Sequence, residues 1–258
     1  MNEKKPLILI TNDDGITSNG IRTLVSVAKE FGDVVVVAPD SPQSGMGHAI
    51  TIGQPLRLHK TPLFENVESW QTSGTPVDCV KLARDKVLSR KPDICLSGIN
   101  HGANHSINII YSGTMSAAME AAIEGIPSAG FSYVDYNFEA DVSCCVPIVR
   151  EVIQKMLETP LPQHTLLNVN IPKVSNEAYK GLKLCRQAYA KWQEEFDERI
   201  DPRGEKYYWM TGKFVNMDTE DNTDVEALKE GFASVVPIKF DFTDYEFKKQ
   251  LATWWQLT

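Results

Sequence analysis

The hydrophobic pattern in the first two-thirds of the chain alternates between two kinds of apolar segment. Short runs rich in β-branched residues are typical of strands buried on both faces, as in parallel sheets. Five such strands are predicted, at Pro6–Thr11, Val34–Pro39, Asp93–Ser97, Pro127–Tyr133 and Leu166–Ile171. The segments with helical spacing of apolar residues are Gly20–Glu30, Pro76–Leu88, Met115–Glu124 and Ser143–Leu157. This alternation predicts a Rossmann-like, three-layer α/β fold with a mostly parallel sheet.

The pattern changes C-terminal to residue 175, where helical periodicity weakens and aromatic residues alternate with polar ones. The segments are two runs typical of antiparallel strands, Lys206–Phe214 and Ala233–Phe240, the acidic loop between them, Asp218–Asp224, and a short amphipathic helix, Asp244–Trp254. We therefore expect an α/β core that binds metal and phosphate over residues 1–175. Residues 176–258 are expected to form a C-terminal β-hairpin or β extension with a terminal helix, packed on the same domain and serving dimerisation.

Composition and charge restrict the classes of partner. The chain has 258 residues, a net charge of −8 and a pI near 5.2, so it lacks the basic surface that grips nucleic acid. A small phosphorylated substrate fits this acidity if a metal ion supplies local positive charge. The five cysteines have no CxxC spacing, which argues against zinc-finger and redox motifs. The apolar run Leu7–Ile10 is too short for a signal peptide or a membrane span, so we expect a cytoplasmic protein without a membrane partner.

An acidic pair, Asp13 and Asp14, follows the first predicted strand within the sequence Thr11–Gly15. In open parallel sheets, ligands bind beyond the carboxyl ends of the strands. Two adjacent carboxylates repel each other unless a cation or a proton compensates, and hard oxygen ligands suit Mg²⁺ or Mn²⁺. The same residues are also common turn chemistry, with Asn12 or Asp13 merely ending the strand. The pair alone leaves both interpretations open.

Two further loops and a helix start carry oxygen ligands and glycines after other predicted strands. Pro39–His48 is rich in Gly and Ser, and Ser97–Asn104 offers the amides of Asn100 and Asn104. Tyr111–Thr114 places hydroxyls at the start of a helix, where free amides and the helix dipole favour phosphate. Each segment alone is equally an ordinary loop or helix cap. Their convergence on one rim of a parallel sheet predicts a ligand site.

The roles of two groups of residues stay open at this point. His48, His101 and His105 lie beside the proposed loops and can protonate a leaving alkoxide, although single histidines are more often bystanders. The aromatic run Tyr207–Trp209 is either a platform for stacking a base or, more commonly, part of a hairpin core or a dimer interface.

Two other protein classes fit the pattern less well. A phospho-accepting receiver module also has an acidic pair after its first strand, but it needs an aspartate at the end of its third strand, where this chain has Ser97. A dinucleotide-binding oxidoreductase needs a third glycine that the run Gly45–Gly47 lacks. Metal-assisted phosphomonoester hydrolysis is therefore favoured. A phospho-accepting or metal-binding α/β module without hydrolytic activity stays as the alternative.

Several motifs in order resemble those of one known family. The stretches are ILITNDDGI, VVVVAPDSPQSGMGHAIT, TSGTPVDCVKLA, SGINHGANHS, YSGTMSAAMEA, GEKYYWMTG and TDVEALKEGFASVVPI. Across nearly its whole length the chain resembles the stationary-phase survival protein SurE family, the 5′/3′-nucleotidases. The resemblance implies hydrolysis of nucleoside 5′-monophosphates, with 3′-monophosphates and short polyphosphate as further substrates. It also implies a homodimer or a tetramer in which a C-terminal β extension exchanges between subunits.

The resemblance also implies roles for individual residues. One divalent cation per subunit, Mg²⁺ or Mn²⁺, would be bound by Asp13, Asp14, Ser44 and Asn100. The phosphate pocket would be lined by Asn12, Asn104, Ser112, Gly113 and Thr114. Asp13 and Asp14 would be the catalytic residues of the 5′-nucleotidase, a phosphoric monoester hydrolase. They would activate a water molecule or form a covalent aspartyl-phosphate, and the sequence does not separate these two mechanisms.

Overall fold

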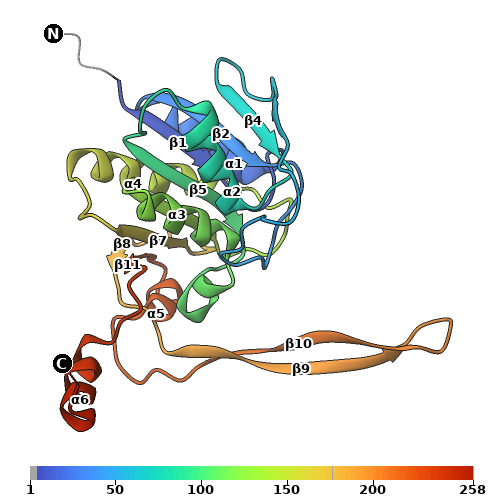
Figure 1. Ribbon diagram of the computed structural model, residues 1–258, viewed down its shortest axis with the longest axis vertical. Coiled ribbons are helices and arrows are strands. Elements are labelled where there is room, and N and C mark those ends of the chain that lie inside the picture. The colour runs from blue at the N-terminus through green and yellow to red at the C-terminus, as the bar shows by residue number, and fades with distance from the viewer. Residues whose placement is uncertain (1–4, 176, 258) are drawn as a thin grey trace.

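A nine-stranded sheet with the order β3-β4-β2-β1-β5-β6-β7-β11-β8 forms the centre of the computed structural model, which describes residues 5–175 and 177–257 (Figure 1). The strands are β1 (Leu7–Thr11), β2 (Asp33–Pro39), β3 (Leu58–Lys60), β4 (Glu68–Thr72), β5 (Ile94–His101), β6 (Ser128–Tyr133), β7 (Thr165–Ile171), β8 (Leu182–Leu184), β9 (Ala190–Ile200), β10 (Lys206–Asn216) and β11 (Ala233–Lys239). Strands β9 and β10 pair only with each other, as a long hairpin that extends from the core.

The helices cover both faces of the sheet. They are α1 (Asn19–Ala28), α2 (Pro76–Leu82), α3 (Gly113–Ile123), α4 (Val146–Glu158), α5 (Asp224–Lys229) and α6 (Tyr245–Trp255). A π-helical turn, Ala83–Val87, and two 3₁₀ turns, Ser106–Ile110 and Ser143–Cys145, complete the helical segments. Within the part of the chain that the structure describes, no helix combines the length and the apolar character needed to cross a membrane.

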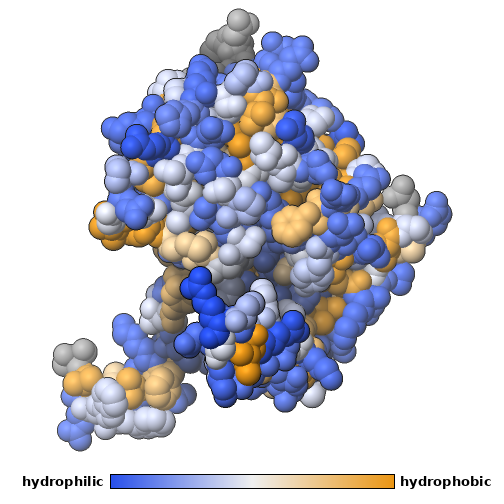
Figure 2. Space-filling view, turned by 90° about the vertical axis from the view of Figure 1, so that its right-hand side faces the viewer, coloured by the Kyte–Doolittle hydropathy of each residue, from blue (hydrophilic) through white to orange (hydrophobic). Residues whose placement is uncertain are grey.

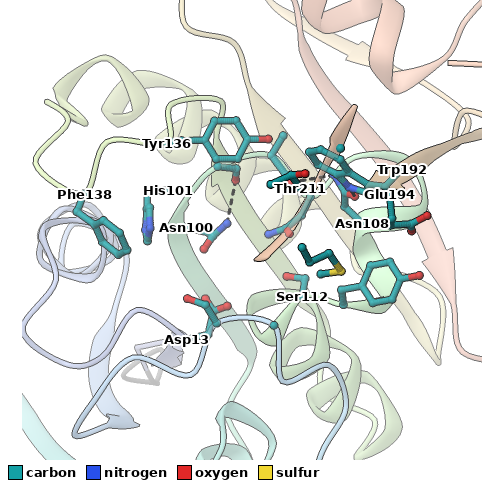
Figure 3. A pocket seen from close by; sticks show the side chains of 18 residues that line it. Asp13, Asn100, His101, Asn108, Ser112, Tyr136, Phe138, Trp192, Glu194 and Thr211 are labelled. Carbon is teal, nitrogen blue, oxygen red and sulfur yellow. Dashed lines mark hydrogen bonds between the residues drawn. The ribbon is translucent and has the colours of Figure 1, made fainter. Parts of the chain in front are cut away.

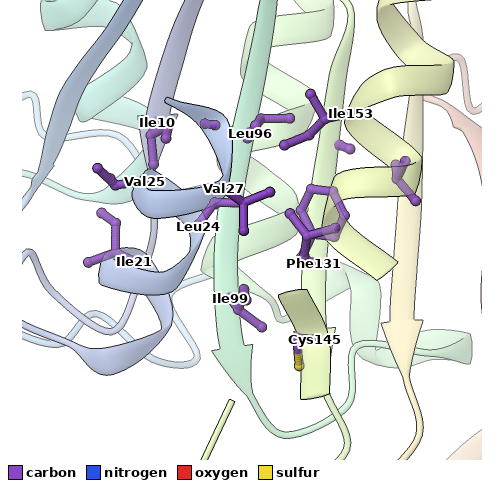
Figure 4. Close-up of a cluster of buried hydrophobic side chains, with 14 of the residues drawn as sticks. Ile10, Ile21, Leu24, Val25, Val27, Leu96, Ile99, Phe131, Cys145 and Ile153 are labelled. Carbon is purple, nitrogen blue, oxygen red and sulfur yellow. The ribbon is translucent and has the colours of Figure 1, made fainter. Parts of the chain in front are cut away.

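The alternation of side chains along β1 explains the three layers. Ile8 and Ile10 point to one face of the sheet and pack in a cluster with residues of α1 and α4, part of which Figure 4 shows. Leu7 and Leu9 point to the other face and join a cluster with residues of α2 and α3. Because both faces of the strand are buried, the whole run is apolar. The predicted three-layer α/β fold is confirmed.

All five predicted core strands are present as β1, β2, β5, β6 and β7, and they pair in parallel in the order β2-β1-β5-β6-β7. The four predicted core helices are α1 to α4. The helix predicted over Pro76–Leu88 is shorter as an α-helix, because it ends at Leu82 and continues as the π-helical turn. The edge strands β3 and β8, the strand β4 next to β3, and the hairpin strand β9 were not predicted from the sequence.

Both predicted C-terminal antiparallel strands are present, each with a different partner strand. The runs Lys206–Phe214 and Ala233–Phe240 do form strands, as β10 and β11, but they do not pair with each other. Strand β10 pairs antiparallel with β9, a charged segment whose apolar alternation is interrupted by Glu194 and Glu198. Strand β11 pairs antiparallel with β7 and parallel with the edge strand β8. The acidic loop also ends earlier than expected, because its last residue, Asp224, begins helix α5.

At the carboxyl edge of the sheet, the backbone of helix α1 is in close contact with the end of strand β5. The pairing of β5 with β6 shifts in register between Ser97 and Asn100, so the end of β5 leaves the regular sheet. Helix α1 packs tightly on this irregular stretch, because a Cβ atom on Gly20 would lie 1.9 Å from the carbonyl oxygen of Ile99. Only glycine permits this approach.

Candidate functional site

A cavity of about 880 Å³ lies at the carboxyl edge of the sheet, between the core and the base of the hairpin (Figure 3). Five of the residues predicted to bind metal or phosphate line it: Asp13, Ser44, Asn100, Asn104 and Ser112. They come from the segments that follow β1 and β2, from the end of β5 and its following loop, and from the cap of α3. The predicted convergence of these segments on one rim is therefore observed.

Asp13 is at the floor of this cavity and is held from behind by helix α3. Only 3% of the residue is exposed. Its carboxylate accepts hydrogen bonds from the hydroxyl of Thr114 and from the backbone N–H of the same residue. A Cβ atom on Gly113 would lie 2.7 Å from the Cβ of Asp13, so the first turn of the helix approaches this side chain as closely as a residue without a side chain allows.

The electrostatics at Asp13 favour a bound positive charge. Burial is the largest cause that raises the pKa of Asp13, from 3.8 to about 6, and repulsion from Asp14 raises it further. The hydrogen bonds from Thr114 act in the opposite direction but do not outweigh burial. A cation placed against this carboxylate would offset both unfavourable terms.

Asp14 points away from the main cavity toward His101. Its Oδ1 atom lies 2.9 Å from Nδ1 of His101, and its Oδ2 accepts the backbone N–H of the same histidine at 3.3 Å. The hydrogen bond with Asp14 raises the pKa of His101, and burial lowers it to a lesser extent. The ring of Phe138 covers the imidazole at 3.7 Å between centroids. Asp14 lines a smaller neighbouring cavity of about 240 Å³, and His101 lines both cavities.

Asn100 and Ser44 supply neutral oxygen atoms beside the acidic pair. The amide nitrogen of Asn100 donates to the carbonyl of Gly102 at 2.8 Å, which leaves its amide oxygen for a ligand. Figure 3 shows this side chain facing Asp13 across the cavity. Ser44 is exposed, in the loop after β2. That loop is fixed to the core by the backbone N–H of Gln43, which donates to the carbonyl of Asp13 at 2.7 Å.

The loop that carries Ser44 is also fixed at its far end, on helix α2. Asp78 in the first turn of that helix accepts hydrogen bonds from the backbone N–H and the hydroxyl of Thr51, at 3.2 and 2.6 Å. The same carboxylate accepts the N–H of Thr75 at 2.9 Å, which completes a capping box. The hydroxyl of Thr75 in turn donates to the carbonyl of Ala49 at 2.7 Å.

Ser112 and Asn104 offer hydrogen-bonding groups for an anion. Ser112 is the N-cap of α3, and its Oγ accepts the N–H of Met115 at 3.1 Å. The first amides of a helix have no partner within the helix, and the helix dipole favours negative charge there. Asn104 is fixed by its backbone N–H, which donates to Asn170 at 2.7 Å, and by its side-chain amide, which donates to Ser132 at 2.8 Å.

The other predicted phosphate ligands lie behind the cavity surface. Asn12 is fully buried, and its amide nitrogen donates to the carbonyl of Gly15 and to the hydroxyl of Ser18, both at 2.9 Å. Gly113 and Thr114 contact Asp13. In this structure these three residues shape the acidic turn, and direct phosphate contact by them stays a prediction.

Of the candidate histidines and aromatic residues, only one histidine lines the cavity. His101 lines the cavity, whereas His48 pairs with the buried Glu120 at 3.0 Å and His105 packs edge-on against Phe214. Burial lowers the pKa of His105. The run Tyr207–Trp209 lies outside the cavity, although the residues that follow it, Met210 to Gly212, line it.

Sequence reasoning did not find a second group of cavity residues. They are Tyr136 and Phe138, from the loop after β6, and Trp192, Glu194 and Thr211, from the hairpin. The motif GEKYYWMTG gave an indirect signal, because its last residues reach the cavity. The signal for β9 was weak, because its apolar residues Trp192, Phe196 and Ile200 are at alternate positions but Glu194 and Glu198 interrupt the pattern.

The donor atoms fit a hard divalent cation. Among the described residues, no three or more His, Cys, Asp or Glu side chains are grouped as a metal site, so Asp13 and Asp14 need neutral oxygens to complete a ligand set. The amide oxygen of Asn100 and the hydroxyl of Ser44 provide them. Carboxylate, amide and hydroxyl oxygens, with water completing the shell, suit Mg²⁺ or Mn²⁺.

Fold and site together define a doubly wound α/β protein with an acidic, oxygen-lined ligand cavity at the carboxyl edge of its sheet. The model of the family "Survival protein SurE" matches residues 8–194. The chain belongs to the SurE family.

Relatives match this chain over nearly its whole length. A protein of Christiangramia forsetii named 5′-nucleotidase SurE is 57% identical over 256 residues, 98% of each chain. One of Flavobacterium psychrophilum with the same name is 55% identical over 97% of this chain and 98% of its own. The crystal structure of the SurE protein from Aquifex aeolicus has a TM-score of 0.83 at 38% identity and covers 96% of this chain and 99% of its own.

Proposed function

We propose that this protein is a divalent-metal-dependent 5′-nucleotidase, which hydrolyses nucleoside 5′-monophosphates to nucleoside and phosphate. The observation that carries the proposal is the single cavity in which Asp13, Asn100 and Ser112 meet at the carboxyl edge of the sheet. The name 5′-nucleotidase SurE, given to relatives of 57% and 55% identity over almost the full chain, supports the same activity.

One divalent cation per subunit would be held by Asp13, Asp14, Ser44 and Asn100. When bound, such a cation neutralises the phosphoryl oxygens and lowers the pKa of a water molecule, so that water becomes a nucleophile near neutral pH. The raised pKa of Asp13 is the electrostatic argument for this assignment, because the folded chain leaves a buried carboxylate without a compensating charge.

The residues of the chain would bind and orient the phosphate around this centre. The hydroxyl of Ser112, the first free amides of α3 and the amide of Asn104 would donate to the equatorial phosphoryl oxygens and stabilise their charge. Thr114 would keep Asp13 in its orientation through the hydrogen bonds described above.

His101 is the candidate to protonate the leaving 5′-oxygen, because it is the one of the three candidate histidines that lines the cavity. Its contact with Asp14 raises the pKa of the imidazole and keeps it protonated closer to neutral pH. A protonated leaving group departs as the neutral nucleoside hydroxyl, so the step needs no alkoxide.

The test is phosphate release from a panel of nucleoside 5′- and 3′-monophosphates and tripolyphosphate, with Mg²⁺, Mn²⁺ or chelator. We expect metal-dependent release from the 5′-monophosphates, and the rest of the panel ranks the 3′ and polyphosphate activities. Acid quenching followed by hydroxylamine trapping reports a covalent aspartyl-phosphate if one accumulates. A stable phosphoaspartate without turnover, or no release from any nucleotide with either metal, would contradict the proposal.

A further inference from the structure

Part of the large cavity is not used by the phosphate chemistry above. The cavity is also lined by aromatic rings from two segments far apart in the sequence: Tyr136 and Phe138 after β6, and Trp192 of β9. Figure 3 shows Tyr136 and Trp192 across the cavity from Asp13, whereas Phe138 lies beside His101. A cavity that is acidic and oxygen-lined at one end and aromatic at the other suits a ligand with a phosphate at one end and a flat ring at the other.

Trp192 is held rigidly with its aromatic surface at the cavity. Its indole N–H donates to the amide oxygen of Asn108 at 2.7 Å, and its ring packs edge-on against Phe214 at 5.7 Å between centroids. The polar atom of the ring is therefore satisfied, and 36% of the residue remains exposed. Because the ring is already fixed and its N–H already has a partner, a ligand can stack on it without first ordering the side chain.

Tyr136 gives a second exposed ring at the same cavity. It is 64% exposed and lies over the backbone of Gly102, where a Cβ atom would come within 2.8 Å of the ring. The glycine has a φ of +94°, a conformation that other residues rarely adopt, so the backbone leaves room for this ring. A large exposed aromatic side chain at a cavity is typical of a ligand contact.

Glu194 adds one charged group to the same end of the cavity. Its carboxylate makes no hydrogen bond or ion pair with the described residues, and no Lys or Arg of the described chain lines the cavity with it. An anionic group of a ligand would be repelled here, whereas neutral hydroxyls can donate to the carboxylate. Carboxylates bind the hydroxyls of a ribose in this way in other α/β folds.

We propose that this end of the cavity is the nucleoside subsite, in which the base stacks between Trp192 and Tyr136 and the ribose hydroxyls donate to Glu194. The inference rests on the proposed nucleotidase function and extends it to the part of the substrate that does not react. It assigns recognition of the base to stacking, because the nearby polar groups of Asn108 and Thr211 already have partners in the protein.

The test compares AMP with ribose 5-phosphate, which keeps the phosphate and the sugar but lacks the base. Trp192→Ala and Tyr136→Ala should each raise KM for AMP about tenfold, as expected for the loss of base stacking. Both variants should leave kcat/KM for ribose 5-phosphate within about twofold of wild type. Trp192→Phe should retain most of the affinity for AMP. Tyr189→Ala, at an exposed tyrosine outside the cavity and outside both the hairpin and helix α6, is the matched control.

Glu194 is tested by the ratio of kcat/KM for AMP to kcat/KM for 2′,3′-dideoxy-AMP. Both substrates carry the same charge, so a general effect of charge on anionic substrates cancels in this ratio. Wild type should prefer AMP over 2′,3′-dideoxy-AMP, and Glu194→Ala should reduce this preference about tenfold. The base-directed variants Trp192→Ala and Tyr136→Ala should leave the preference unchanged.

The outcomes separate the subsite from the reaction itself. If wild type releases phosphate from neither AMP nor ribose 5-phosphate, the proposed function fails. If wild type hydrolyses AMP but Tyr136→Ala changes both substrates equally or neither, the base subsite is wrong while the nucleotidase function stands. Tyr136 decides this point because its exposed position makes its truncation harmless to the fold, whereas Trp192 also packs on Phe214.

Discussion

Asp13 combines burial, a neighbouring carboxylate and two hydrogen bonds from Thr114, and each has an effect that can be measured. The hydroxyl of Thr114 donates to Asp13, so it orients the carboxylate and stabilises its ionised form. Residues that support a metal ligand in this way typically change metal affinity or activity ten- to a hundredfold.

We therefore expect Thr114→Val to weaken Mg²⁺ affinity, measured by calorimetry, about tenfold or more. The substitution keeps the shape of the side chain but removes the hydroxyl, while Thr114→Ser keeps the hydroxyl and should stay close to wild type. Equal affinities for valine and serine variants would show that the hydrogen bond to Asp13 has no role in metal binding.

The raised pKa of Asp13 predicts a pH-dependent penalty in the metal-free protein. The pKa of Asp13 in the folded chain, about 6, exceeds the ordinary aspartate value of 3.8 that applies in the unfolded chain. The folded state therefore disfavours ionisation of this carboxyl group. The penalty is absent below pH 4, grows between pH 4 and pH 6, and reaches up to about 3 kcal/mol above that window.

Urea unfolding with chelator should therefore show that Asp13→Asn is more stable than wild type at pH 7.5, and that this advantage shrinks at pH 5. Adding Mg²⁺ should stabilise wild type and leave the asparagine variant nearly unchanged. An Asp13→Asn variant that gains no stability at either pH would contradict the buried, uncompensated carboxylate.

At the scale of elements, the cap of helix α2 and the loop that carries Ser44 are one unit. The carboxylate of Asp78 accepts three hydrogen bonds, from Thr75 and Thr51, so it caps the helix and holds the loop at the same time. Removing it leaves buried donors without a partner.

We expect Asp78→Ala to lower the free energy of unfolding by about 1–3 kcal/mol and to raise the metal concentration needed for half-maximal activity. Thr51→Val removes only the hydrogen bond from the loop hydroxyl, because the backbone N–H of residue 51 and the helix cap with Thr75 still donate to Asp78. Thermal unfolding and metal titration of both variants make the comparison. If both variants need the same metal concentration as wild type, the hydrogen bonds of Asp78 to the loop have no role in metal binding.

The elements differ in how far the sequence predicts them, for physical reasons. Strands β1, β2 and β5 are buried on both faces, so their apolar runs identify them and point to the segments at their carboxyl ends. The choice of Asp13, Ser44 and Asn100 as metal ligands came from the family resemblance. Strand β9 is exposed along almost its whole length, and two glutamates interrupt the alternation of its apolar residues, so its pattern is too weak to identify a strand. Trp192 and Glu194 reach the cavity through a pairing that depends on the whole fold, and local periodicity carries no record of it.

At the scale of the whole molecule, large apolar side chains are exposed on two projecting elements. Helix α6, described over its full length, has no buried residue, and Figure 2 shows it at lower left as a lobe with apolar surface. The exposed side chains of α6 and its end are Tyr245, Phe247, Trp254, Trp255 and Leu257, and those of the hairpin include Phe196, Ile200, Tyr208 and Trp209. Surfaces of this kind are typical of subunit interfaces.

We expect the protein to form a homodimer or a tetramer through these two elements, measured by sedimentation equilibrium. A chain that ends at residue 243, without α6, should dissociate at concentrations where the full chain stays associated. The double substitution Trp254→Ser and Trp255→Ser should weaken association in the same direction. A full-length chain that sediments as a monomer at every concentration would contradict this expectation.

In the proposed function, the acidic pair at the carboxyl edge of the sheet is the centre of a metal-dependent nucleotidase. This proposal is tested most directly by phosphate release from 5′-AMP with Mg²⁺, Mn²⁺ or chelator, for wild type, Asp13→Asn and the exposed control Asp33→Asn. We predict metal-dependent release by wild type and the control, and a loss of at least about a hundredfold in Asp13→Asn. Release that persists in chelator, or that survives in Asp13→Asn, would contradict the account.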